Sequence, residues 1–164
     1  MRYSKIRKMD ISNGPGIRVS LFTQGCPFHC DGCFNKETWD FNGGNEYTEE
    51  TENKLLSLCN KEQIAGLSIL GGEPLIERNL DNIYKLAEKF HKKFLYKDIW
   101  LWTGFMYGRL SNKQKEALKY IDVLIDGQFD KTKQDFNLKF KGSTNQRIID
   151  VKQSMQKGVC VLRE

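Results

Sequence analysis

The chain has 164 residues, of which 39% are hydrophobic and 29% are charged, and its formal net charge is +5. This is enough for one domain, residues 1–164, with a substantial core, but it excludes a complete eight-unit α/β barrel, which needs roughly 250 residues. The positive charge is modest, so we interpret it as a solvated face rather than as a nucleic-acid-binding surface.

The N-terminal ten residues include basic side chains but no apolar core of a secretion signal. Apolar runs such as Ile99 to Trp102 are far too short to cross a bilayer. We therefore expect a cytoplasmic protein with no membrane partner. In that reducing compartment the five cysteines are expected to be ligands or free thiols, and Cys59 and Cys160, which lie in apolar segments, are interpreted as core thiols.

The first predicted strand follows a turn. Asn13 to Gly16 combines two glycines, which allow positive φ, with a proline that favours a tight bend. Ile17 to Gln24 is rich in β-branched and aromatic residues and ends at Gly25, directly before Cys26. The loop that begins at this cysteine therefore lies at the carboxyl end of a strand, where α/β folds place their chemistry.

Three thiols, those of Cys26, Cys30 and Cys33, lie in this loop with the spacing C-x-x-x-C-x-x-C. Three thiolates cannot complete a tetrahedral zinc site without a fourth ligand, but they can bind three irons of a 4Fe-4S cluster and leave the fourth iron open. Thiolate is soft and negatively charged, which suits iron at low potential. The residues alone leave two alternatives open: a zinc loop completed by His29 or a distant group, and a disulfide.

Helices and strands alternate in the next hundred residues. Thr48 can cap a helix that carries Leu55, Leu58 and Cys59 on one face, and a second helix is expected around residues 80–90. Ser111 fits a capping box at the start of a third, short helix. The predicted strands are residues 66–70, 98–103 and 122–126. This alternation predicts a parallel sheet with right-handed crossovers.

The pattern becomes less regular after residue 128. We expect a polar turn at residues 142–147 and two late strands, near residues 147–149 and 159–162.

The predicted parallel strands end at Gln24, Leu70, Thr103 and Asp126, and these ends would line one rim, where polar residues collect. Gly71 and Gly72 allow a ligand to approach the backbone, and Glu73 offers a carboxylate to an ammonium group. Taken alone, Gly-Gly before Pro74 also fits a simple strand-to-helix turn, and Asp126 before Gly127 fits a turn-initiating side chain.

The cysteine spacing resembles the signature of the radical S-adenosylmethionine enzymes, and residues 71–73 look like the GGE motif of that family. The resemblance implies that S-adenosylmethionine chelates the open iron and that one electron from the reduced 4Fe-4S cluster cleaves it to methionine and a 5'-deoxyadenosyl radical. It also implies a partial, open parallel α/β barrel of the radical S-adenosylmethionine type.

The same resemblance implies site residues. The cluster ligands would be Cys26, Cys30 and Cys33. The cofactor contacts would be Gly32, Cys33, Phe34, Gly71, Gly72, Glu73, Thr103 and Asp126. Gly32 departs from the wider family, in which many members place an aromatic residue before the last cysteine to pack on adenine. Phe34, or the backbone of residues 32–34, is expected to provide that contact, and Gln128 and Phe129 are expected near the incoming substrate.

Further motifs resemble enzymes that install a glycyl radical in another protein, and more narrowly the activating proteins of anaerobic ribonucleoside-triphosphate reductase. The resemblance runs from Asn13 to about Asp150 and rests on residues 14–18, 21–22, 25–26, 29, 32, 34–35, 100–104, 125–127, 142–143 and 145–147. It implies two partners: the large, glycine-bearing subunit of that reductase and a flavodoxin-like electron donor. The alternatives are a formate-lyase activator, an enzyme of modified-base synthesis, and a zinc-binding nucleic-acid adaptor without catalysis.

Overall fold

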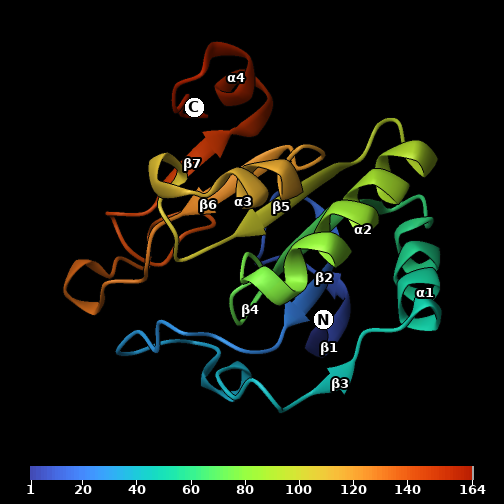
Figure 1. The fold of residues 1–164 in the computed structure, drawn as a ribbon, viewed down its shortest axis with the longest axis horizontal. Coiled ribbons are helices and arrows are strands. Elements are labelled where there is room, and N and C mark those ends of the chain that lie inside the picture. The colour runs from blue at the N-terminus through green and yellow to red at the C-terminus, as the bar shows by residue number, and fades with distance from the viewer. Residues whose placement is uncertain (164) are drawn as a thin grey trace.

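The computed structural model describes residues 1–163, in which one seven-stranded sheet has the order β3-β1-β2-β4-β5-β6-β7 (Figure 1). Strands β2, β4, β5 and β6 are parallel to one another, whereas β1, β3 and β7 are antiparallel to their neighbours. The bounds are β1 Arg2–Asp10, β2 Ile17–Thr23, β3 Asn45–Glu46, β4 Ile64–Gly71, β5 Asp98–Trp102, β6 Val123–Asp126 and β7 Arg147–Asp150.

The four parallel strands lie where the sequence predicts strands, and β7 matches the late strand expected near residues 147–149, so the expectation of an α/β fold is confirmed. The predicted parallel arrangement is confirmed for these four strands, whereas the strands at both edges of the sheet are antiparallel to their neighbours. Strand β1, which we did not predict, forms a hairpin with β2 through the turn at Asn13 to Gly16. Strand β7 is antiparallel because residues 127–146 return the chain to the end of the sheet where β6 finishes.

Four α-helices lie within residues 1–163: α1 Glu49–Cys59, α2 Leu80–Lys93, α3 Asn112–Ala117 and α4 Val151–Lys157. The predicted caps are confirmed, because Thr48 accepts a hydrogen bond at the start of α1 and Ser111 forms a capping box at the start of α3. Helix α4 was not predicted. The expected late strand at residues 159–162 is wrong, since only Leu162 forms a single bridge, to Ile149. None of the helices in the described range is both long and apolar enough to cross a membrane.

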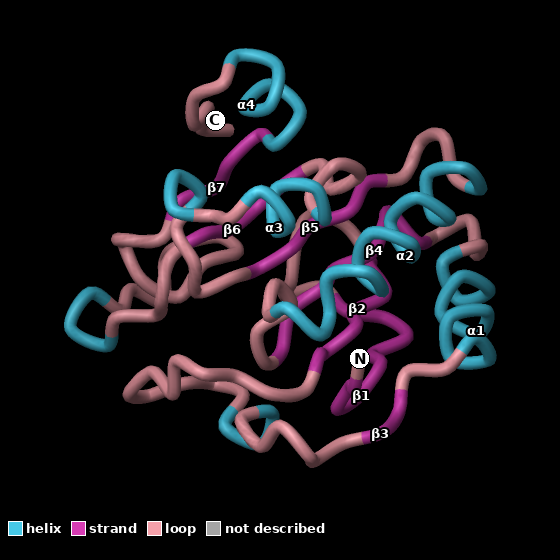
Figure 2. Tube along the Cα trace, in the orientation of Figure 1, coloured by secondary structure: helices cyan, strands magenta, loops and turns pink. Residues whose placement is uncertain are grey.

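Alternating side chains give the sheet two different faces. One face packs against the helices in the main core, whose sheet residues include Val19, Leu21, Leu67, Ile69, Ile99, Leu101 and Leu124. Cys59 is fully buried in this core, as predicted, whereas Cys160 is only partly buried against it. The opposite face carries Trp100, Val123 and Ile125 and is covered by loops. Figure 2 shows the long loops that follow β2 and β6 beyond the same ends of the parallel strands.

Candidate functional site

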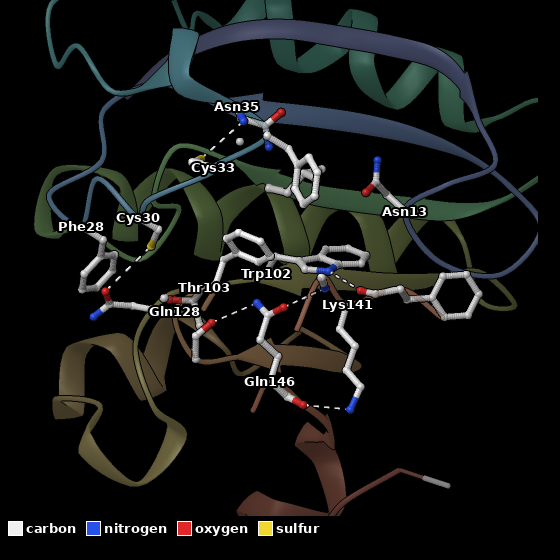
Figure 3. A pocket seen from close by; sticks show the side chains of 18 of the residues that line it. Asn13, Phe28, Cys30, Cys33, Asn35, Trp102, Thr103, Gln128, Lys141 and Gln146 are labelled. Atoms are coloured by element: carbon white, nitrogen blue, oxygen red, sulfur yellow. Dashed lines mark hydrogen bonds between the residues drawn. The ribbon is translucent and has the colours of Figure 1, made fainter. Parts of the chain in front are cut away.

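A cavity of about 510 Å³ opens on the loop-covered face of the sheet (Figure 3). Its walls are the cysteine loop, the ends of β4 and β5, and the segment 127–146. Most of the predicted site residues line it: Cys26, Cys30, Cys33, Phe34, Gly71, Gly72, Glu73 and Thr103. Gly32 and Asp126 are not part of the lining.

The three cysteines of the loop are partly buried free thiols. Burial raises the pKa of Cys26 and Cys30, and backbone N–H groups of Phe28 and His29 oppose this shift at Cys26 by donating hydrogen bonds to its sulfur. The N–H of Asn35 lies 3.4 Å from the Cys33 Sγ. Hydrogen bonds to cysteine sulfur are among the features that set the potential of iron–sulfur clusters, so the donor set fits such a group.

A cluster and a single metal ion make different demands on the arrangement of the three thiols. Within residues 1–163, no three His, Cys, Asp or Glu side chains are arranged to hold one ion. Zinc would require all its ligands in one coordination sphere. A four-iron cluster does not, because each thiolate binds a different iron. A cluster therefore asks less convergence of the three thiols than the zinc site that the sequence left open.

The backbone of the cysteine loop is shaped by His29 and Gly32, whose φ angles are 46° and 74°. The His29 ring stacks on Trp39, with ring centroids 4.4 Å apart and planes 7° from parallel. A Cβ on Gly32 would lie 3.3 Å from side-chain atoms of Lys131 and Phe129. The imidazole is thus engaged with Trp39, which agrees with leaving it out of the ligand set.

Glu73 joins the ends of two strands. Its Oε1 accepts hydrogen bonds from the Leu75 N–H at 2.9 Å and the Thr103 hydroxyl at 2.7 Å, and its Oε2 accepts one from the Gly104 N–H at 2.7 Å. The side chain is almost fully buried, and burial raises its pKa from 4.5 to about 7 although these hydrogen bonds oppose the shift. An ammonium group could contact this carboxylate only by sharing it with three donors already in place.

The two glycines before Glu73 are needed for packing within the protein. A Cβ on Gly72 would lie 2.5 Å from the Gly25 carbonyl oxygen, and Gly71 has a φ of 105°. The N–H groups of Gly72 and Glu73 donate to the carbonyls of Thr23 and Gly25, both at 2.8 Å. These contacts hold the turn after β4 against the end of β2, next to the first cysteine.

Asp126 lies away from the cavity. Its carboxylate is fully buried, pairs with the Arg147 guanidinium at 2.9 Å, and accepts the Tyr107 N–H at 2.8 Å. We therefore leave Asp126 out of the cofactor contacts proposed below.

Sequence reasoning missed several lining residues. Trp102 contributes to the lining of the cavity, and its Nε1–H donates to the Phe140 carbonyl at 2.8 Å. Arg7 and Asn13 line it from the β1–β2 hairpin (Figure 3 labels Asn13). The alternation of Trp100 and Trp102 with the core residues of β5 was a usable signal, because it points both indoles to the face without helices.

Comparisons with known proteins identify the family of the chain. The model of the 4Fe-4S single cluster domain matches residues 12–149. The chain is 40% identical over 150 residues to the anaerobic ribonucleoside-triphosphate reductase-activating protein of Vibrio cholerae, covering 90% of this chain and 97% of that protein. It is 40% and 38% identical over 148 residues to the proteins of that name from Salmonella typhi and Escherichia coli, covering 89% of this chain and 96% of each relative. The chain therefore belongs to the family of anaerobic ribonucleoside-triphosphate reductase-activating proteins, and it contains a 4Fe-4S single cluster domain.

Proposed function

We propose that this protein is the enzyme that activates an anaerobic ribonucleoside-triphosphate reductase, using a 4Fe-4S cluster and S-adenosylmethionine. The observation that carries the proposal is that Cys26, Cys30, Cys33 and the Gly71–Glu73 turn line one cavity at the ends of parallel strands. When bound, the cluster supplies the electron that cleaves the sulfonium to methionine and a 5'-deoxyadenosyl radical, which takes a hydrogen atom from a glycine of the reductase.

The residues of the chain have distinct parts in this proposal. The three cysteines would hold the cluster through three irons and would leave one iron for the amino and carboxylate groups of S-adenosylmethionine. The backbone of residues 71–73 receives the amino group, while Glu73 and Thr103 keep the two strand ends together. Phe34, which is exposed at the cavity and tilted against Phe129 with ring centroids 5.3 Å apart, offers an apolar surface to the adenine.

The proposed fold is a partial, open barrel of the radical S-adenosylmethionine type, and its small size suits a protein substrate. A radical must be shielded from water and side reactions, and enzymes for small molecules enclose their substrates to do this. The reductase can instead provide its own cover by inserting the glycine-bearing segment into the cavity. We assign the electron to a flavodoxin-like donor and place the reaction in the cytoplasm, whose reducing conditions keep thiols free.

The test replaces the cysteines one at a time in anaerobically reconstituted protein. We expect Cys26→Ala, Cys30→Ala and Cys33→Ala each to abolish reductive formation of methionine and 5'-deoxyadenosine. Cys160→Ala is the control, because this thiol is partly buried and lies outside the cavity lining. Cleavage that persists in all three loop variants would rule out the cluster assignment.

The substrate is tested separately, by incubating the protein with the reductase and recording a glycyl radical by electron paramagnetic resonance. Cleavage without that radical would leave a radical S-adenosylmethionine enzyme with another substrate.

A further inference from the structure

The polar segment of residues 142–147 holds the loop that follows β6. The Gln146 side chain makes three hydrogen bonds: its Oε1 accepts from the N–H groups of Gly142 at 2.8 Å and Ser143 at 3.2 Å, and its Nε2 donates to the Gly127 carbonyl at 3.0 Å (Figure 3). Because one amide side chain satisfies backbone groups on both segments, it fixes the position of the loop.

That loop presents Gln128 to the cysteine loop. The Asn145 Nδ2–H₂ donates to the Gln128 carbonyl at 2.8 Å, so the backbone of Gln128 is held by the same polar segment. Its side-chain Oε1 lies 3.8 Å from the Cys30 Sγ, with the thiol as the donor (Figure 3). Space for this side chain depends on Gly104, where a Cβ would lie 3.3 Å from the Gln128 Cγ.

The direction of this hydrogen bond must reverse when Cys30 is a cluster ligand. A thiolate has no proton to donate, so the carbonyl end of the amide would then face a negative sulfur. A half-turn of the terminal amide exchanges its oxygen and nitrogen at little steric cost. The Gln128 side chain is exposed, so solvent can solvate the oxygen after the turn. The nitrogen then donates an N–H to the sulfur.

We propose that Gln128 donates a hydrogen bond to the Cys30 sulfur in the cluster-bound protein and raises the reduction potential of the cluster, with Gln146 as the residue that positions it. Hydrogen bonds to ligand sulfur stabilise the added negative charge of the reduced state and so move the potential upward. This inference rests on the proposed cluster.

The first measurement is the midpoint potential of the cluster, from a redox titration followed by electron paramagnetic resonance, together with iron and sulfide content. Gln128→Leu removes the donor and is expected to shift the potential to a more negative value. Gln128→Glu also removes the donor and adds a negative charge near the sulfur, so it should shift the potential further in the same direction. Iron and sulfide content should stay at the wild-type level in both variants, because Gln128 is not a ligand.

The second measurement tests the positioning role with a double-variant cycle. Gln146→Leu releases the loop and should lower the potential in the wild-type background. In the Gln128→Leu background, Gln146→Leu should not lower the potential further, because the hydrogen-bond donor that Gln146 positions is already absent. Gln153→Leu, at an exposed glutamine in the first turn of α4, is the matched control and should leave the potential unchanged.

The outcomes separate this inference from the proposed function. Wild-type potentials in both Gln128 variants, with iron and sulfide intact, would overturn the inference and leave the cluster assignment standing. Equal shifts from Gln146→Leu in both backgrounds would overturn the positioning role. Wild-type protein that binds no iron and sulfide would overturn both proposals.

Discussion

Glu73 is expected to make the protein less stable as the pH rises toward neutrality. Burial raises its pKa from the ordinary 4.5 to about 7 in the folded protein. Between these two values the folded protein keeps a proton that the unfolded chain has released, so raising the pH favours unfolding. Each pH unit in this window changes the free energy of unfolding by about 1.4 kcal/mol. The stabilisation of the folded protein by protonated Glu73 is therefore fully present below pH 4.5. About 3 kcal/mol of this stabilisation is lost by the time the pH passes 7.

The assay compares wild-type protein with Glu73→Gln by urea unfolding under anaerobic conditions between pH 5 and pH 8. Glutamine can still accept from Thr103 and Leu75 but no longer from Gly104, which costs about 1–3 kcal/mol at every pH. Only the wild-type protein should lose a further ~2.5 kcal/mol between pH 5 and pH 8. The other titrating groups are the same in both proteins, so their contributions cancel in the difference between the two free energies of unfolding. A constant difference in the free energy of unfolding from pH 5 to pH 8 would refute burial as the dominant influence on this carboxyl.

Two further substitutions test contacts that hold the strand ends. Gly72→Ala places a Cβ 2.5 Å from the Gly25 carbonyl oxygen. We therefore expect a loss of about 1–3 kcal/mol in the free energy of unfolding, together with a lower iron content. Gly108→Ala is the control and should change neither quantity, because a Cβ there would have no atom within 4 Å. Arg147→Met leaves the buried carboxylate of Asp126 without its cation, and it should lower the free energy of unfolding, measured in urea, by about 3 kcal/mol. This is the lower end of the range for buried ion pairs, because the arginine side chain is one-third exposed. An unfolding curve identical to that of the wild type would contradict either argument.

The central strands could be predicted because each is a short apolar run that ends at a glycine or a polar residue. β1 could not, since Asp10 is its only buried residue and its sequence shows no two-residue alternation. It is next to the edge of the sheet and is stabilised by pairing with β2, which is a tertiary contact. The antiparallel direction of β7 could not be predicted either, because it depends on the path of residues 127–146.

In the candidate site, as in the fold, features set by residues close together in the sequence could be predicted, whereas contacts between distant residues could not. The cysteine loop was predictable because its three thiols lie in one short segment. The surroundings of Asp126 were not, because Arg147 is 21 residues away and both residues fit simple turn chemistry when considered separately. The contact between Gln128 and Cys30 joins residues 98 positions apart and depends on the polar segment that supports the loop.

The Gly71–Glu73 turn combines a folding requirement with the binding role that we propose for it, and this affects how its variants must be interpreted. The hydrogen bonds from Gly72 and Glu73 to the end of β2 place this turn beside the residue that precedes Cys26. Any ligand held by the turn is therefore positioned relative to the cysteine loop by the same contacts that keep β2 and β4 together. A substitution here changes both at once, so loss of activity alone cannot identify a cofactor contact. Unfolding free energy and iron content, measured on the same variant, separate the two effects.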